Sequence, residues 1–314
     1  MENLELFTTA LTDKINHMVS GMDIKAEMTV VTKNNQTRRI GLVFHQKENQ
    51  KKADGTEDQG DHVCFLRKLF DAAEIRKVYE KGIPMEYIAE SLIMDCMMQE
   101  NGGSPETEFD CSQITDYKKV RGRLALKLVN RKLNRQMLAD TPHICIWEDL
   151  ACVCYIALKQ PESGKVMVQR SWLEGWNVTE SELMQTAMEN TEKLFPAEIK
   201  NLADVIRKFI PCSEKEDNDR KIYIVTNVKN TYGAVCILYK GLLKRVATML
   251  ESDLILLPSS VHEFLVVPYR KMEKSGMEFN QMIKEVNAAH LEQEEILSDH
   301  AYMYCRETGD VCSL

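Results

Sequence analysis

Two pairs of adjacent residues, His262-Glu263 and Asp299-His300, carry the side chains best suited to chemistry. Imidazole nitrogens and carboxylate oxygens bind divalent metals, and such a set can leave one coordination position open for a reactive water. That site would belong to a metal-dependent hydrolase, with His262 and His300 as metal ligands and all four residues as catalytic candidates. The spacing does not require it, because His-Glu here lacks the second histidine of a helical metalloprotease motif.

The competing interpretation gives the same residues a structural role. Residues 252–268 hold two short apolar runs around Ser259-Ser-Val-His-Glu263, which is typical of two buried strands meeting at a polar corner. Polar side chains at such corners usually satisfy backbone groups. The two serines lack the G-x-S-x-G context of an activated nucleophile. Hydrogen-bonded scaffolding is therefore the preferred interpretation of both histidines.

A basic run without any acidic residue extends from residue 117 to residue 139. Such a run can follow phosphate groups. The candidate contacts with phosphate or nucleic acid are Lys119, Arg121, Arg123, Lys127 and Arg131. Because the run lacks the interleaved aromatic residues that stack on single strands, we expect it to form the solvated face of a strand and a helix.

No common nucleotide-binding motif occurs in the chain, so the cofactor, if there is one, stays unknown. The ten cysteines have irregular spacing and mostly apolar neighbours, which predicts reduced, structural thiols with Cys154 and Cys236 in the core. On a strand, Cys152 and Cys154 would share one face, but zinc binding there needs two further ligands.

The composition is that of a globular protein, with 314 residues and 44% hydrophobic content. A formal net charge of −8 argues against attraction of the whole surface to nucleic acid or to an anionic membrane. No apolar run approaches the roughly 18 residues that a membrane helix needs. The acidic N-terminus lacks a signal-peptide core. The sequence therefore predicts a cytoplasmic protein that does not bind membranes.

Hydrophobic periodicity predicts an α+β fold with mixed, largely antiparallel sheets flanked by helices. In the first part we expect a hairpin turning at Asn34-Asn35 and a polar loop over 46–61. The other expected elements there are a helix at 3–20, strands at 26–32, 40–45 and 63–66, and helices at 67–81 and 85–99. Residues 100–115 are the expected linker, so the predicted domains are 1–100 and 116–314.

In the second part, a Thr-x-x-Glu capping box predicts a helix that begins after Thr179 and runs to 193. The other expected helices lie at 131–139, 240–250 and 275–290. The expected strands lie at 124–128, 151–158, 165–169, 222–226, 234–238, 254–257, 264–267 and 301–305, the last of these closing the chain beside 264–267. Residues 211–220 are expected to form a solvated loop.

Several strings identify a family resemblance, among them Leu257-Pro-Ser-Ser-Val-His-Glu263, Ile296-Leu-Ser-Asp-His300 and Tyr232-Gly-Ala-Val-Cys-Ile-Leu-Tyr239. With them the chain resembles, over nearly its whole length, the domain-of-unknown-function family numbered 5688, seen in anaerobic Gram-positive bacteria. It is more distantly similar to the uncharacterised YtpQ-like family. Residues 63–70 depart from the expected pattern. The resemblance implies a bacterial cytosolic protein and carries no catalytic residues.

Three functions stay open. The preferred one is a non-catalytic accessory or interaction protein, which binds an unknown protein partner through an exposed sheet edge or a groove. The first alternative is a metal-dependent hydrolase with its site around His262 and Asp299-His300. The second is a nucleic-acid-associated factor that uses the basic run at 118–135, a less favoured partner class.

Overall fold

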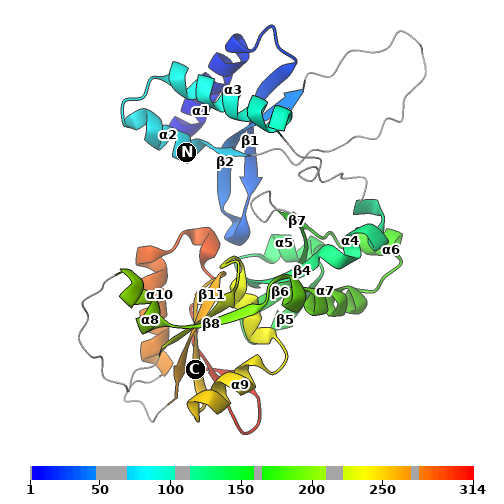
Figure 1. The fold of residues 1–314 in the computed structure, drawn as a ribbon, viewed down its shortest axis with the longest axis vertical. Helices are drawn as coiled ribbons and strands as arrows, with labels where there is room; N and C mark the ends of the chain where they lie inside the picture. The colour runs from blue at the N-terminus through cyan, green and yellow to red at the C-terminus, as the bar shows by residue number, and fades with distance from the viewer. Residues whose placement is uncertain (1, 47–68, 103–113, 159–164, 210–221, 270–275) are drawn as a thin grey trace. The chain divides into compact units, whose positions relative to one another are not determined.

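A computed structural model describes residues 2–46, 69–102, 114–158, 165–209, 222–269 and 276–314 (Figure 1). Its contacts divide the chain into two compact units. Unit 1 is built from Met1–Lys33, Thr37–Asp116 and Leu158–Gly164, and unit 2 from Asn34–Gln36, Tyr117–Ala157 and Lys165–Leu314. That 1–100 and 116–314 are separate domains stays a prediction. The expected loops at 46–61 and 211–220 and the expected strand at 63–66 lie outside the described residues.

Unit 1 packs helices on a small antiparallel sheet. Its elements are α1 (Glu2–Met18), β1 (Ile24–Thr32), β2 (Arg38–Gln46), β3 (Phe70–Asp71), α2 (Ala72–Glu80) and α3 (Met85–Gly102). The sheet order is β1-β2-β3. The predicted first helix and hairpin are confirmed, and so is the helix pair, although the helix expected at 67–81 begins only at Ala72 because Phe70–Asp71 pair as β3. Asp71 ends β3 and starts α2, because its carboxylate accepts from the backbone N–H groups of Ala73 and Glu74.

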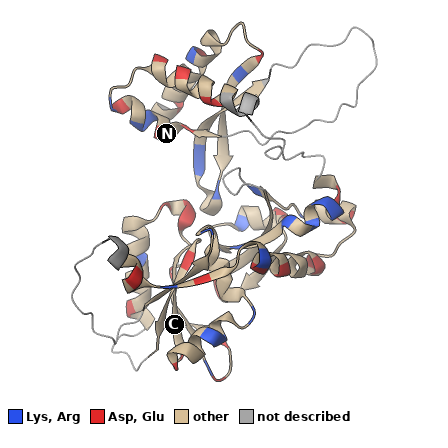
Figure 2. Ribbon diagram, in the orientation of Figure 1, with Lys and Arg blue, Asp and Glu red and all other residues tan. Residues whose placement is uncertain are grey.

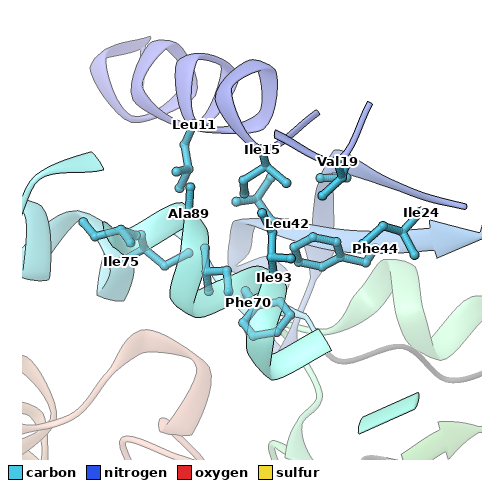
Figure 3. Close-up of a cluster of buried hydrophobic side chains, with 13 residues drawn as sticks. Leu11, Ile15, Val19, Ile24, Leu42, Phe44, Phe70, Ile75, Ala89 and Ile93 are labelled. Carbon is cyan, nitrogen blue, oxygen red and sulfur yellow. The ribbon is translucent and has the colours of Figure 1, made fainter. Parts of the chain in front are cut away.

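The core of unit 1 follows from helical spacing (Figure 3). Leu11 and Ile15 lie on one face of α1, Val19 follows the last residue of the helix at the same spacing, and all three are buried. They face a sheet surface that contains Leu42 and Phe44. Full burial of each such side chain stabilises the fold by roughly 1.5–3 kcal/mol.

The turn between β1 and β2 forms the short 3-10 helix η1 (Asn34–Gln36), whose contacts place it in unit 2. Asn35 has a φ of 56°, as expected from the tolerance of asparagine for this region. Asn35 and Asn134 are both buried and exchange hydrogen bonds, and the Asn35 amide also donates to the carbonyls of Gln293 and Ile296. The turn is thus fixed by residues distant in sequence.

The first half of unit 2 contains a four-stranded antiparallel sheet. Its elements are α4 (Tyr117–Val120), η3 (Arg121–Arg123), β4 (Leu124–Asn130), α5 (Arg135–Asp140), β5 (His143–Ile146), β6 (Leu150–Ala157), β7 (Lys165–Met167), α6 (Trp172–Trp176) and α7 (Glu180–Leu194). β6 pairs with β4 on one side and with β5 and β7 on the other. The capping box at Thr179 is confirmed. Strand β5 escaped prediction because only four residues form it.

The second half of unit 2 is organised by a six-stranded sheet of order β13-β12-β10-β11-β9-β8. Its elements are β8 (Ala197–Asn201), α8 (Leu202–Phe209), β9 (Tyr223–Asn227), η5 (Gly233–Leu238), α9 (Leu242–Leu250), β10 (Leu254–Ser260), β11 (Glu263–Pro268), α10 (Gly276–His290), η6 (Gln293–Glu295), β12 (Tyr302–Tyr304) and β13 (Val311–Ser313). All strand pairs in the described residues are antiparallel, so the predicted α+β class is confirmed.

Three expectations in this half were wrong. Residues 234–238 form the 3-10 helix η5 rather than a strand, because a short buried apolar run does not by itself distinguish the two. β12 pairs with β10 rather than with β11. β12 is also not the last strand, because β13 follows it and pairs with it.

Candidate functional site

The corner between β10 and β11 is held by hydrogen bonds on three sides. The backbone N–H of Val261 donates to the carbonyl of Glu295 in η6, at 2.9 Å. The backbone N–H of His262 donates to the Ser260 hydroxyl, and its carbonyl accepts from the Thr226 hydroxyl of β9. The backbone at His262 is therefore fixed by β9, β10 and η6 together.

Both ring nitrogens of His262 have neighbours. Nδ1 accepts from the backbone N–H of Tyr232 at 3.0 Å, so the neutral ring carries its proton on Nε2. Nε2 lies 3.6 Å from a carboxylate oxygen of Glu295. Burial lowers the pKa of His262 below its ordinary value, although Glu295 opposes the shift, and Lys165 lowers this pKa further. The imidazole is thus held mainly neutral, with no nitrogen left over to act as a general base.

Tyr232 lies at the centre of this region in a strained backbone conformation. Its φ of 53° is uncommon for a bulky side chain, and strain of this kind persists only where the surroundings enforce it. Next to it, a Cβ on Gly233 would lie 2.3 Å from the Thr226 hydroxyl and 2.7 Å from the His262 carbonyl oxygen. Only glycine fits there, so the chain holds the Tyr232 backbone against β9 and the corner.

The Tyr232 ring is surrounded by cations and by another ring. Lys165 Nζ lies 3.9 Å from the ring centroid and Lys127 Nζ lies 5.1 Å from it. The imidazole of His262 lies 5.4 Å away at an interplanar angle of 32°. We call Lys127, Lys165, Tyr232, His262 and Glu295 the Tyr232 cluster.

Lys127 corrects the expectation that the strand in the basic run has a solvated face. It is only 2% exposed, and Nζ donates to the side-chain oxygen of Asn34 in η1 at 2.7 Å. All of β4 is buried, because helix α7 covers β4 and β6 pairs with it. Of the other phosphate candidates, Lys119 and Arg121 are exposed, while Arg123 and Arg131 are half-buried. Figure 2 colours the lysines and arginines of this run blue, some of them near α4.

In the part of the chain that the structure describes, the hydrogen bonds of Asp299 and His300 involve Asn287 and Ser298 rather than His262 or Glu263. The Asp299 carboxylate accepts from the Asn287 side chain at 2.8 Å. The backbone N–H of His300 donates to the hydroxyl of Ser298 at 2.9 Å. Glu263 accepts from the Ser259 hydroxyl at 3.2 Å. In the ranges that the structure describes, no three His, Cys, Asp or Glu residues form a group suited to a metal ion.

Ser298 is part of a closed polar network that we call the Asp149 network, made of Asp149, Ser298 and Tyr302. The hydroxyls of Ser298 and Tyr302 donate to different oxygens of the Asp149 carboxylate. All three side chains are buried. Burial, and next the charge of Asp149, raise the pKa of the Tyr302 hydroxyl. In this network, two neutral hydroxyl groups donate to one carboxylate. These hydrogen bonds connect the β5–β6 turn, which contains Asp149, to β12, which contains Tyr302.

The outer edge of β1, in unit 1, is a second feature with binding potential. The Asn16 side chain accepts from the Ala26 N–H and donates to the Ala26 carbonyl, so both groups point away from β2. Backbone groups two and four residues later on an antiparallel strand point the same way, so those of Met28 and Val30 also face outward. Within the described residues, no strand pairs with β1 on this side.

The sequence singled out His262 and, separately, Lys127 of the basic run, but not the other members of the Tyr232 cluster. Tyr232, Lys165 and Glu295 come from three distant segments, and only the Tyr-Gly pair gave a local signal, since glycine beside an aromatic residue can indicate a tight backbone approach. Ser259 and Ser260 do not donate to the imidazole, which a serine nucleophile activated by histidine would do.

The chain is thus an α+β protein in which two lysines lie near one tyrosine ring. A family model described as "Family of unknown function (DUF5688)" matches residues 4–306. The chain therefore belongs to this family. No curated protein and no solved structure matches the chain. Among the described helices, none has the length and apolar character needed to cross a bilayer.

Proposed function

We propose that this protein is a non-catalytic accessory protein that binds an extended segment of a partner protein at the open edge of β1. The observation that carries the proposal is the outward orientation of the Met28 and Val30 backbone groups. An added strand would form hydrogen bonds with these groups, each contributing about 1 kcal/mol, and its side chains would supply specificity.

Within the described residues, several features that usually block strand addition are missing from this edge. β1 is nine residues long, contains no proline and pairs with β2 without a bulge. The Asn16 side chain forms hydrogen bonds with the backbone of Ala26, and further along the strand Val30 is 40% exposed. The edge therefore resembles a template for pairing rather than a protected edge.

Charge indicates the chemistry of the partner. Lys25, Lys33 and Arg38 are exposed on the hairpin, where Figure 2 shows blue segments, and Glu27 lies beside His45. A complementary strand would alternate apolar residues with acidic ones, since opposite charges across a strand pair are favourable. The partner class is thus an acidic, strand-forming segment.

Amide hydrogen exchange of the free protein gives the first test. The N–H groups of Met28 and Val30 should exchange faster than those of Thr29 and Val31, which face β2. Equal protection of all four amides would contradict an open edge.

Selection of ten-residue peptides from a display library on the full chain gives the second test. Val30→Pro removes an outward N–H without disturbing the pairing with β2, and should abolish binding of the selected peptides. Val30→Thr, the matched control, keeps the N–H and should keep binding. Peptides that bind both variants equally would place the binding site elsewhere.

The two alternative functions stay hypotheses with direct tests. Metal analysis of the purified protein, with His262→Ala and His300→Ala as variants, tests the metal-dependent hydrolase. Titration with DNA and RNA, with Lys119→Gln and Arg121→Gln as variants, tests the nucleic-acid factor. The bacterial, cytoplasmic setting and the distant YtpQ-like similarity rest on the family resemblance and are part of the proposal.

A further inference from the structure

We infer that the Tyr232 cluster is a binding site for a small anionic group, a carboxylate or a phosphate, held by the ammonium groups of Lys165 and Lys127 beside the Tyr232 ring. This site is in unit 2 and does not depend on the edge of β1. Three features of the described residues support it: the enforced backbone, the arrangement of the cations and the state of His262.

The backbone of the cluster is enforced from several directions. Tyr232 is held in the left-handed region by its hydrogen bond to His262 Nδ1 and by the close packing of Gly233. A strained aromatic residue costs of order 1–3 kcal/mol, and such strain is concentrated at functional sites. The purely structural need is a turn into η5, which a glycine or asparagine would supply with less strain. The chain instead places an aromatic ring there.

The cations converge on that ring. Because Lys165 Nζ and Lys127 Nζ lie 3.9 Å and 5.1 Å from one centroid, they are no more than 9.0 Å apart. Charge-assisted hydrogen bonds of about 2.8 Å from each ammonium group allow one multi-oxygen anion to bridge them, with a small movement of the flexible Lys165 stem. Buried Lys127 lies in a low-dielectric environment, where its attraction for an anion is stronger than in water.

The protonation of His262 should be sensitive to such an anion. Its proton lies on Nε2, toward Glu295, and its lowered pKa keeps it neutral beside the two lysines. Glu295 and Glu263 are the acidic groups that act on the ring, and Lys165 is the cation that does so. A bound anion would partly neutralise Lys165 and would itself favour the imidazolium, so the pKa of His262 would rise on binding.

The burial of Lys127 limits the ligand. Because this residue is only 2% exposed, the phosphates of a nucleic-acid duplex do not reach it, and the proposed ligand is a single anionic group that enters beside Lys165. Carboxylates and phosphates share the required chemistry, and the two arms of the experiment distinguish them.

Calorimetric titration of the full chain with inorganic phosphate in one arm and succinate in the other tests the inference. At least one anion should bind saturably in the millimolar range or tighter, and the preferred arm identifies the group. Lys165→Gln keeps the stem and removes the charge, and should weaken binding at least tenfold. Lys244→Gln, an exposed lysine on α9, is the matched control and should bind as the wild type does.

NMR titration of the His262 ring in the same variants separates a built site from surface attraction. The pKa of His262 should rise when the wild type binds its anion, and should not respond to the anion in Lys165→Gln. No saturable binding in either arm would overturn the inference. Binding that Lys165→Gln retains, or that Lys244→Gln loses equally, would also overturn it, and thermal unfolding of each variant verifies that it is folded.

Discussion

The Tyr232 cluster and the Asp149 network are both polar regions of unit 2, yet they are built in opposite ways. In the Asp149 network, two hydroxyl groups meet the two oxygens of one carboxylate, and every side chain is buried. In the Tyr232 cluster, cations lie over an aromatic ring, one backbone residue is strained, and Tyr232, Lys165 and His262 remain half-exposed. The first arrangement lies wholly in the interior, whereas the second brings one buried and one half-exposed ammonium group to a single ring.

This difference distinguishes scaffold from candidate site. A fully satisfied network adds stability and fixes one arrangement of its elements. A strained, charged cluster costs stability, so its persistence calls for a reason beyond folding. Three variants test the contrast, in order of decreasing expected effect.

Gly233→Ala should have the largest effect, destabilising the protein by about 3 kcal/mol. The new Cβ would meet backbone atoms, Asn227 N at 2.6 Å and the His262 carbonyl oxygen at 2.7 Å, which do not move aside cheaply. Denaturant unfolding measures the change. Gly122→Ala, where nothing lies within 4 Å of the added Cβ, is the control and should change stability by less than about 0.5 kcal/mol. Similar values for both would mean that the close packing at Gly233 is not enforced.

Tyr302→Phe should destabilise the protein by about 2 kcal/mol, because it leaves the buried Asp149 carboxylate without one of its donors. Anion binding should be unchanged, since the Asp149 network is separate from the Tyr232 cluster. Tyr87→Phe removes an exposed hydroxyl in α3 and should have no measurable effect on stability. A loss of anion binding in Tyr302→Phe without unfolding would show that the two regions are coupled.

His262→Gln should have the smallest effect, visible in the pH dependence of stability. The pKa of His262 is lower in the folded than in the unfolded chain, so above the ordinary value of 6.5 both states are neutral there. As the pH falls below 6.5, the unfolded chain takes up the proton first, and stability is lost. The wild type should therefore lose more stability than His262→Gln between pH 7.5 and pH 5.5. An equal or smaller loss in the wild type would contradict the burial of a neutral ring.

Local signals in the sequence predicted most elements correctly. The spacing of Leu11, Ile15 and Met18 indicated α1, and the Thr179 capping box marked the start of α7. The apolar runs of β10 and β11 also formed the predicted strands, with Leu256 and Val266 buried. These features depend on neighbours within a few residues, so they can be recognised without knowledge of the fold.

The site depended on contacts that no local pattern contains. His262 accepts a hydrogen bond from Tyr232, which lies 30 residues earlier in the chain. The contact of His262 with Glu295 connects the corner between β10 and β11 to η6. Lys127 alternates with leucines as a solvated residue would, but its ammonium group donates to Asn34 of η1 and lies near the Tyr232 ring, both distant in sequence. Long-range packing decided both outcomes, which is why the sequence indicated His262 and Lys127 as separate candidates but not that they lie at one ring.

The fixed turn at Asn35 has a consequence for synthesis of the chain. Asn35 donates hydrogen bonds to Asn134, Gln293 and Ile296, which lie 99, 258 and 261 positions away in the sequence. At translation rates of about 5–20 residues per second, the turn emerges from the ribosome at least ~13 s before its last acceptors. The hairpin can form early, but its tip stays exposed to other partners, chaperones included, until nearly the whole protein has been made.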